Sequence, residues 1–510
     1  MKKFLTLFFL SISVALYGQV HQPDRYEIEL EMFEDSYNVL IGDETGVLLY
    51  KPLGTFQSGK ELWQFIKLDT ALNEEWVKQY YFNRNHVFKG YDYHANNFSL
   101  LFQITDQGSH DLLLIQMNEH SGDTLRHVIK SLVTIQLEIF EMTTEAAIIG
   151  GYYNQDPVLT YYDLSERKLK VLPGIFGHKT QLIQVKIEDE LIRVLLSGRT
   201  YDNRNTMVIK TYDADGNYLE NYVFDPAEGL GLIFGRVADV GNEGSIICGT
   251  YGARRSEYSR GLFIAQHNTN EEQVMKYFNF ADLDNFFTYL KAKRQTRISN
   301  RITRKKIKGK KVKFNYRLLV HEILETEDEY VMLGEAFYPK YNSSATYGGY
   351  GGPDNNSYMP MSFAGYKYTH AVVIGFDKNG KKLWDNSFQI EDVLSYSLEQ
   401  YVHADVSDDK VVLFYLYNNE IRTKIINGSE VVEGKSFNSV KLMFEDDVAS
   451  KKNVTNIGGL DKWFDHNFLA YGVQKIKNLK DSGVKLNRRV FYINKIIYQD
   501  SEPKSTDLSE

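Results

Sequence analysis

Thr369–Gln389, with the sequence THAVVIGFDKNGKKLWDNSFQ, contains a strand, a tight turn and a second strand. Its first half, Ala371–Phe376, is a short apolar run of the kind that forms a buried strand. Asp377 and Gly380 bracket the turn, because Asp accepts hydrogen bonds from nearby backbone and glycine adopts positive φ at little cost. Lys382–Gln389 then alternates polar and apolar residues, as a half-exposed strand does. This stretch therefore predicts a β-hairpin.

An apolar strand, Tyr330–Gly334, precedes this hairpin, and apolar inner strands like it recur along the whole chain. The first five end at Tyr50, Phe102, Gly150, Gly198 and Gly249, which are 48 to 52 residues apart. A period of about 50 residues suits one four-stranded blade of a β-propeller. Eight such strands occur in all: Val47–Tyr50, Phe98–Phe102, Ala147–Gly150, Val194–Gly198, Ile246–Gly249, Val331–Gly334, Val411–Tyr415 and Phe468–Gly472.

The two ends of the repeat array complement one another. The last repeat contains Arg489–Tyr498 but no outer strand after it, whereas Arg25–Phe33 alternates like a strand and has no local partner. An open ring would leave an unpaired sheet edge. We therefore expect an all-β fold, a single propeller of eight blades over residues 19–498, closed by the N-terminal strand. Seven blades is the alternative, because the blades near Asp405–Ser439 and Asn453–Tyr498 are poorly patterned. Two unrelated β-domains of sandwich type are a further alternative.

The turn and the aromatic residue that follows it resemble a known class. Asp377, Gly380 and Trp384 form an Asp-x-x-Gly turn followed by Trp, which resembles the repeats of secreted bacterial β-propeller proteins. The resemblance covers nearly all of residues 25–498. It implies a fold and not an activity, because propellers host many functions.

The N-terminal residues predict export. Lys2 and Lys3 precede the apolar run Phe4–Leu16, so residues 1–18 match a signal peptide and are too short for a comfortable membrane span. We expect a bacterial protein that is periplasmic or extracellular after cleavage, without a transmembrane span. An uncleaved anchor is the alternative. Residues 499–510 are polar, and we expect a disordered tail.

Charge is distributed unevenly along the chain. The formal net charge is −8, and residues 291–313 alone carry twelve Lys and Arg without an acid, so the remainder carries −20. An acidic chain with one basic island does not indicate a nucleic-acid partner. The island also contains no aromatic residue for base stacking between Lys291 and Lys313. We expect Asp282–Arg301 to be helical and the following residues to form a basic hairpin that turns at Gly309.

Two insertions are the candidate binding surfaces. Residues 281–313 form an electrostatic patch suited to an anionic glycan, lipopolysaccharide or an acidic protein. Residues 340–368 are predicted to form a surface loop rich in Tyr, Gly, Ser and Asn, the composition of adaptable binding loops. Both can equally be solvated insertions without a partner. The candidate binding residues are Tyr341, Tyr347, Tyr350, Tyr358, Tyr366, Arg294, Arg304, Lys305, Lys306, Lys310 and Lys311.

Metal motifs are incomplete in this sequence. Asp213–Asn217 resembles the start of a calcium loop, but Phe224 occupies the position of the closing Glu, so we predict a turn. His321 begins a zinc-protease pattern, but Glu325 stands where the second His is required. We therefore expect no metal and no cofactor.

Catalytic signatures are equally weak. The one cysteine, Cys248, lies in an apolar run and is predicted to be a core residue. His403 and Asp405 alternate on one strand and are a candidate hydrogen-bonded pair, and Asp461 with Asp465 is a possible acid pair. We find no nucleophile elbow, P-loop or dinucleotide fingerprint.

Together these features favour a monomeric, non-catalytic binding scaffold in the bacterial cell envelope, with a protein or a glycan as partner. The alternative is a glycan-acting hydrolase or lyase with its site in the central channel. Three or more acids, His or Arg converging in the channel would favour that alternative.

Overall fold

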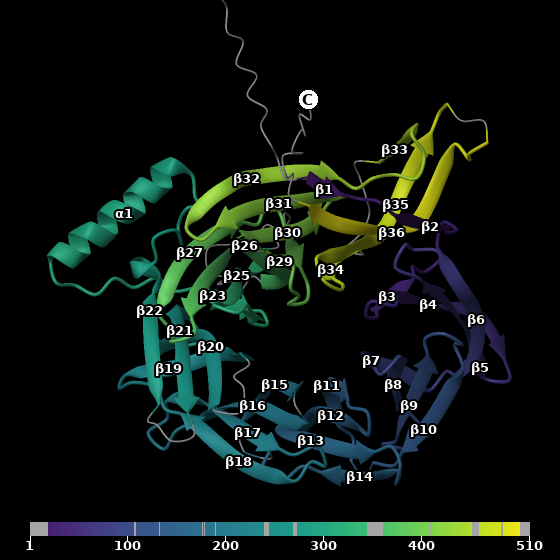
Figure 1. The fold of residues 1–510 in the computed structure, drawn as a ribbon, viewed down its shortest axis with the longest axis horizontal. Coiled ribbons are helices and arrows are strands. Elements are labelled where there is room, and N and C mark those ends of the chain that lie inside the picture. The colour runs from purple at the N-terminus through teal and green to yellow at the C-terminus, as the bar shows by residue number, and fades with distance from the viewer. Residues whose placement is uncertain are drawn as a thin grey trace, which may run out of the picture.

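The chain forms eight antiparallel sheets around a central axis, so the predicted eight-bladed propeller is confirmed (Figure 1). The computed structural model describes residues 19–106, 109–131, 133–175, 177, 179–188, 190–238, 244–268, 273–343, 361–407, 410–450, 458–480 and 483–499. The expected leader and all but the first residue of the expected tail lie outside these residues.

Each blade is built outward from the channel. The apolar strands found in the sequence are second from the channel, and each has a shorter or more polar strand inside it. The innermost strands are β3 (Asn38–Ile41), β7 (His86–His94), β11 (Gln136–Met142), β15 (Gln181–Glu188), β19 (Leu230–Ala238), β23 (Arg317–Val320) with β24 (Leu324–Glu325), β29 (His403–Ser407), and β33 (Asp447–Ala449) with β34 (Gly458–Lys462). The second strands are β4 (Val47–Gln57), β8 (Asn97–Ile104), β12 (Ala146–Tyr153), β16 (Leu191–Arg199), β20 (Gly244–Ala253), β25 (Glu329–Ser343), β30 (Lys410–Tyr417) and β35 (Asn467–Asn478).

The outer half of each blade completes the sheet. The third strands are β5 (Lys60–Leu68), β9 (Leu112–Asn118), β13 (Asp156–Asp163), β17 (Asn205–Tyr212), β21 (Ser259–Asn268), β26 (Met361–Asp377), β31 (Glu420–Asn427) and β36 (Asn487–Gln499). The outermost strands are β6 (Glu74–Asn83), β10 (Thr124–Ile129), β14 (Lys168–Val171), β18 (Tyr218–Phe224), β22 (Val274–Asn279), β27 (Lys382–Gln389), β32 (Glu430–Ser439), and, in the last blade, β1 (Gln19–His21) with β2 (Arg25–Glu29). A short β28 (Leu394–Ser395) also pairs with β26.

The hairpin that dominates the sequence has the predicted turn. The Asp377 carboxylate accepts hydrogen bonds from the backbone N–H groups of Asn379 (3.0 Å) and Lys381 (2.7 Å), and Gly380 has φ 70°. Asp213 accepts in the same way from Asn217 N–H (2.7 Å), so the calcium-like segment is a turn, as predicted. The recurring Asp residues of these turns therefore have a structural role.

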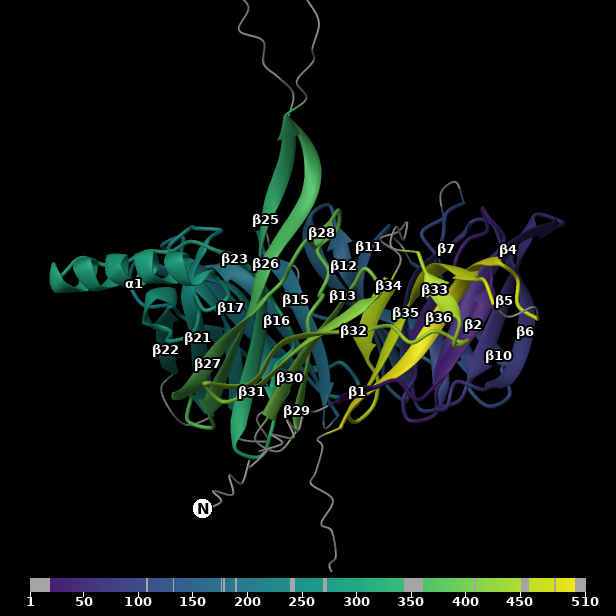
Figure 2. The same ribbon diagram turned by 90° about the horizontal axis from the view of Figure 1, so that it is seen from above.

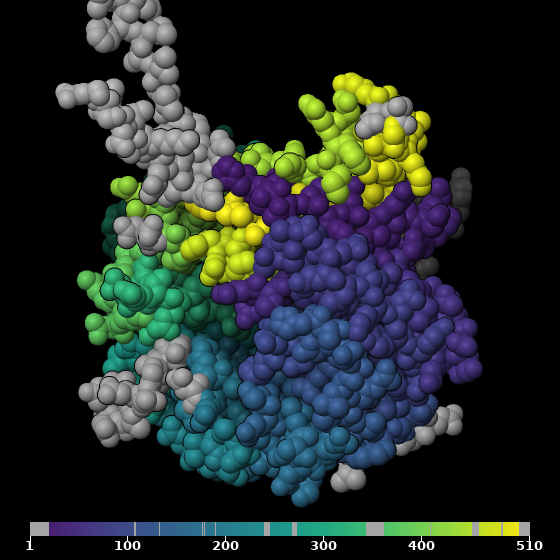
Figure 3. Space-filling view, turned by 45° about the vertical axis from the view of Figure 1, so that its right-hand side comes forward, coloured from purple at the N-terminus to yellow at the C-terminus, as the bar shows by residue number. Residues whose placement is uncertain are grey.

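The N-terminal strands close the ring, as predicted. β1 and β2 pair with β36, with Arg25 opposite Asn494 in the register. The Arg25 guanidinium donates to the side-chain oxygens of Asn494 (2.7 Å) and Gln474 (2.8 Å) and lies over the Tyr492 ring. Figure 3 shows the purple N-terminal residues packed against the yellow C-terminal blade. The last blade therefore depends on both ends of the chain.

The core lies between blades rather than inside one sheet. Apolar side chains of neighbouring second and third strands interlock, as in the cluster of Cys248, Leu262, Val372 and Ile374 from two adjacent blades. The Cys248 thiol is fully buried, and burial raises its pKa, so the predicted core role is confirmed.

The first insertion differs from the expectation. Phe280–Asp282 is a short 3-10 helix, and α1 extends from Ala292 to Ile307, so the predicted basic hairpin is wrong. Gly309 ends the helix: it has φ 64° and donates to Lys306 O (3.0 Å), while Lys310 donates to Lys305 O (2.9 Å). These two bonds form a Schellman cap, which requires a left-handed residue at this position.

The second insertion is not simply a loop. β25 and β26 continue past the ring as a two-stranded hairpin, with Tyr341 opposite Phe363 (Figure 2). Residues 340–343 and 361–368 are therefore strand, which corrects the predicted loop at its flanks. Residues 344–360 lie outside the described residues.

Chain direction places both insertions on one face of the ring. Antiparallel blades put the turns between second and third strands on the same face as the connections between blades. We call this the insertion face: the β25–β26 hairpin rises from it, and the connection that carries α1 starts and ends on it (Figure 2). Among the described residues, no helix is both long enough and apolar enough to span a membrane.

Candidate functional site

Helix α1 extends outward from the rim of the ring (Figures 1 and 2). Its inner side carries Gln295, Ile298 and Ile302, which are only half-exposed. The Gln295 amide donates to the carbonyl oxygens of Thr288 (3.1 Å) and Leu290 (2.6 Å), which fixes the helix start against the preceding turn. No side chain caps the N-terminus, whose dipole therefore favours a nearby anion.

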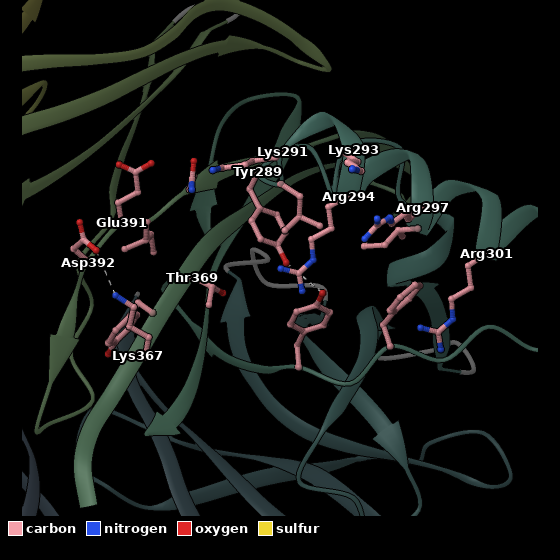
Figure 4. A pocket seen from close by; sticks show the side chains of 17 residues that line it. Tyr289, Lys291, Lys293, Arg294, Arg297, Arg301, Lys367, Thr369, Glu391 and Asp392 are labelled. Atoms are coloured by element: carbon pink, nitrogen blue, oxygen red, sulfur yellow. Dashed lines mark hydrogen bonds and ion pairs between the residues drawn. The ribbon is translucent and has the colours of Figure 1, made fainter. Parts of the chain in front are cut away.

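A groove of about 1010 Å³ lies between α1 and the sixth blade, including the connection that follows this blade. Arg294, Ile298 and Arg301 are spaced by three or four residues and so lie on one helix face. The remaining wall comes from Lys367–Thr369 in β26 and from Gln389–Asp392, which begins at the last residue of β27. Figure 4 shows Lys291, Lys293, Arg294, Arg297 and Arg301 along the helix side, and Glu391 and Asp392 across from them. The groove has one cationic wall about 10 Å long between Arg294 and Arg301, at 1.5 Å per residue.

The two walls differ in how their charges are compensated. Glu391 forms an ion pair with Lys435 (2.8 Å), and Asp392 lies 3.9 Å from the ammonium group of Lys367. No described residue forms an ion pair with the five cations of the helix wall named above. The uncompensated positive charge of the groove is therefore on α1.

The floor of the groove is aromatic and rigid. The Tyr289 ring stacks on the buried imidazole of His370, with ring centroids 3.7 Å apart, and its hydroxyl lies 3.3 Å from that of Tyr316. Burial lowers the pKa of His370 to about 3, so the imidazole is neutral. The Phe314 ring lies beneath Arg301, with its centroid 5.4 Å from the guanidinium carbon. Aromatic residues thus flank the basic island at both ends, which the sequence analysis of Lys291–Lys313 missed.

The predicted basic residues do not form one site. Arg294 lines the groove, whereas Lys306, Lys310 and Lys311 line a separate cavity of about 370 Å³ on another side of the insertion. Lys306 is compensated there by Asp282 (2.7 Å). The Arg304 guanidinium donates back to Asn300 O (3.2 Å) in its own helix, and Lys305 is half-buried.

The predicted tyrosines are partly described. Tyr341 and Tyr366 belong to the projecting hairpin, where Phe363 contacts both rings, with centroids 5.8 Å and 5.0 Å away. They form an aromatic ladder across two strands. Tyr347, Tyr350 and Tyr358 lie outside the described residues.

The central channel contains a second polar site. Four consecutive innermost strands carry a β-bulge at equivalent positions, at Lys89, Glu138, Ile183 and Ile233. Bulges re-aim side chains, and the first three of these residues line a channel cavity of about 380 Å³. Its other polar lining residues are Tyr91, Glu141, Gln184, Arg236 and Glu322.

Hydrogen bonds hold this channel cavity together from several blades. Gln184 accepts from Val237 N–H (3.0 Å) and donates to the Glu322 carboxylate (3.2 Å). Asp92 accepts from Tyr93 N–H (2.9 Å) and Met142 N–H (2.7 Å), so it joins the second blade to the third.

Glu141 differs from these residues, because its carboxyl group has no hydrogen bond from any described residue. Burial, and then the negative charges of Asp92 and Glu322, raises the pKa of Glu141 to about 8. The cavity therefore contains a carboxylic acid that is mostly protonated at neutral pH.

Histidines and acids lie on the other side of the channel. His321 bonds to the buried Glu335 carboxylate (2.8 Å), and does not complete a metal motif. Asp405 is bonded to His466 (2.7 Å), so the predicted pairing with His403 is wrong. His466 is 61 residues away in sequence, on a neighbouring blade.

Asp461 and Asp465, the possible acid pair, have different surroundings in the structure. Asp461 accepts a hydrogen bond from the Tyr471 hydroxyl (2.5 Å), and Asp465 adopts a turn conformation with φ 46°. No group of three or more metal-ligating side chains is found in the described part of the chain.

The comparisons with known proteins concern the fold. No protein-family model and no curated protein sequence matches this chain. The chain is similar to a solved polysaccharide lyase, Uly1, with a TM-score of 0.41 and 10% identity over 92% of this chain and 100% of that one. It is also similar to the β-propeller domain of the Trilobed protease from Pyrococcus furiosus (TM-score 0.36, 8% identity, 82% and 100% covered) and to the Dos1 propeller (0.38, 10%, 82% and 93%). Similarities this low carry no information about ligand or activity.

Proposed function

We propose that this protein is an exported, non-catalytic binding scaffold that holds an acidic polysaccharide in the groove beside α1. The observation that supports the proposal is the cationic wall of α1, whose charges have no acidic partner among the described residues. Arginine forks match carboxylate and sulfate groups, and the uncapped helix N-terminus adds to the same field.

The aromatic floor favours a polysaccharide over an acidic protein. Sugar rings present a flat C–H face that packs on aromatic side chains, and Phe314 and Tyr316 are among the residues that line the groove. The cations are also distributed along the length of the helix, which suits a polymer that carries a charge on each repeating unit. The groove volume of about 1010 Å³ accommodates several sugar units.

Replacing Arg294, Arg297 and Arg301 together by Gln tests this proposal. We expect the affinity for polygalacturonate to fall by roughly 100-fold at low salt, at about 1 kcal/mol for each lost charge-assisted contact. A matched control, in which Arg304, Lys308 and Lys311 are replaced by Gln, removes the same charge from other surfaces and should cost less than about fivefold. Isothermal titration calorimetry measures both.

Three results would contradict the proposal. An equal loss in the two triple variants would mean that only net charge matters. Binding of poly-L-glutamate as tight as that of polygalacturonate would identify an acidic protein as the occupant. No binding of wild-type protein to either polymer would remove the groove as a ligand site.

A catalytic role in the channel is the second candidate function. Acids and an arginine converge there, as a hydrolase or lyase requires, and the raised pKa of Glu141 suits a proton donor. In that case wild-type protein should release reducing ends or unsaturated products from a polysaccharide, and Glu141→Gln should lower the rate at least 100-fold. Identical, background rates for the two proteins would leave binding as the function.

A further inference from the structure

We infer that the channel cavity is a binding site for one uncharged sugar residue or a similar polyol. The site is separate from the groove beside α1, and the inference does not depend on the proposed acidic polysaccharide. Its lining comes from five blades, through residues such as Tyr91, Glu141, Gln184, Arg236 and Glu322. No two of these five are neighbours in sequence, and the stacking of five consecutive blades brings them together.

The charges of the lining argue against an ionic ligand. Lys89 and Arg236 are cationic, whereas Glu138 and Glu322 are anionic. A small anion would be attracted by the first pair and repelled by the second, and the reverse holds for a cation. A neutral ligand meets neither penalty.

The unused hydrogen-bonding groups match hydroxyls. Arg236 donates one hydrogen bond to Ile183 O (3.4 Å), and its buried Nε has no partner among the described residues. The Tyr91 oxygen accepts from Ile41 N–H (2.9 Å), which leaves its hydroxyl proton to donate elsewhere. Glu141 offers a carboxylic acid that both donates and accepts. A polyol, whose every hydroxyl donates and accepts, satisfies such a mixed set, and leaving these groups unpaired is costly.

A larger space adjoins the channel cavity on the side of the insertion face. This space of about 1140 Å³ shares the lining residues Lys89, Leu137, Glu138 and Ile183 with the channel cavity, so the two spaces adjoin one another. This larger space is lined by connections between blades and so opens on the insertion face. Tyr152 and Phe234 provide aromatic surface in this larger space. The inner volume of about 380 Å³ lies at the small end of ligand sites, which fits a single ring.

Binding should weaken as Glu141 ionises. The groups that line the cavity with it are Lys89 and Tyr91 from β7, Glu138 from its own strand, Arg236 from β19 and Glu322 from the segment between β23 and β24. Asp92 from β7 also acts on it electrostatically. A ligand that covers Glu141 would displace the water that hydrates its ionised carboxylate, and this loss of hydration is costly beside the other acids.

Saturation-transfer NMR with methyl glycosides of glucose, galactose, mannose and N-acetylglucosamine tests the inference on the full-length protein. We expect at least one of them to bind, and Arg236→Met to weaken that binding at least tenfold. Arg254→Met, an exposed arginine after β20, is the matched control and should leave it unchanged. Between pH 7 and pH 9 wild-type binding should weaken severalfold, and Glu141→Gln should abolish this pH dependence while retaining binding.

Any of three results would overturn the inference. The first is that none of the four glycosides binds at 20 mM, roughly the concentration needed to detect weak sites. The second is that acetate or methylammonium competes for the cavity better than the sugars do. The third is that binding and its pH dependence are the same in wild-type protein and Glu141→Gln. The last comparison holds even if Arg236→Met fails to fold, and α1 variants that lose polygalacturonate should keep the sugar.

Discussion

The groove beside α1 and the channel cavity contain the same kinds of side chain in opposite physical states. Arg294 and Arg301 project from a surface helix into water and have no acidic partner among the described residues. Arg236 is half-buried in the channel cavity near Glu322, and burial lowers the pKa of its guanidinium group. Exposed charge creates a long-range field at little cost in stability, whereas enclosed charge is expensive and must be paired or neutralised. We therefore expect salt to control binding at the groove and pH to control the channel.

The largest expected effect is on stability in the channel. Because the folded state holds the Glu141 proton up to about pH 8 while the unfolded chain loses it near its ordinary pKa, stability should fall as pH rises between these values. From pH 5 to pH 7.5 the unfolding free energy of wild-type protein should drop by about 3 kcal/mol relative to Glu141→Gln, at 1.36 kcal/mol per pH unit. Urea denaturation across this range measures the difference.

Glu145→Gln is the control for this experiment. Glu145 is an exposed glutamate in the turn after the same strand, β11, and its replacement should give a profile parallel to wild type. If Glu141→Gln also runs parallel to wild type, the carboxyl group is ionised and hydrated, and the contrast between the two regions fails.

A smaller effect is expected from salt. Raising ionic strength from 0.05 to 0.5 M should weaken polygalacturonate binding about tenfold, because exposed charges are screened within a few ångströms at high salt. Sugar binding in the channel should change less than about twofold. Titrations of both ligands at the two salt concentrations check this. A polygalacturonate affinity that is insensitive to salt would mean that aromatic contacts, and not the α1 cations, hold the polymer.

The sequence predicts the strands that are apolar and misses those that are not. Second strands such as Val331–Gly334 are buried on both faces, so their composition alone identifies them. The innermost strands contain bulges and polar residues, as in Gln136–Met142, and their alternation is broken at Glu138. The channel site lies on these strands, so its residues gave no local signal. Glu141 and Arg236 share a cavity because the third and fifth blades face the same part of the channel.

The basic insertion shows a different kind of error. A glycine such as Gly309 is compatible with a hairpin turn, but the same residue type also ends helices. Ile298 and Ile302 are four residues apart in a segment rich in Lys, Arg and Gln, which are good helix formers. Those signals were present and favour the helix. By contrast, the bond from His466 to Asp405 joins two blades, and no local pattern predicts it.

The closing strand also constrains the order in which this protein can fold. Arg25 and its partner Asn494 are 469 residues apart, so the last blade cannot be completed until β36 has been synthesised. The first blades can form earlier from local hairpins, but β1 and β2 must wait unpaired, and contacts between distant residues slow folding. A truncation at either terminus would therefore leave the same blade incomplete, because loss of β1 and β2 exposes the edge of β36 and loss of β36 exposes the edge of β35. Aggregation through that edge is the failure we expect from an interrupted chain.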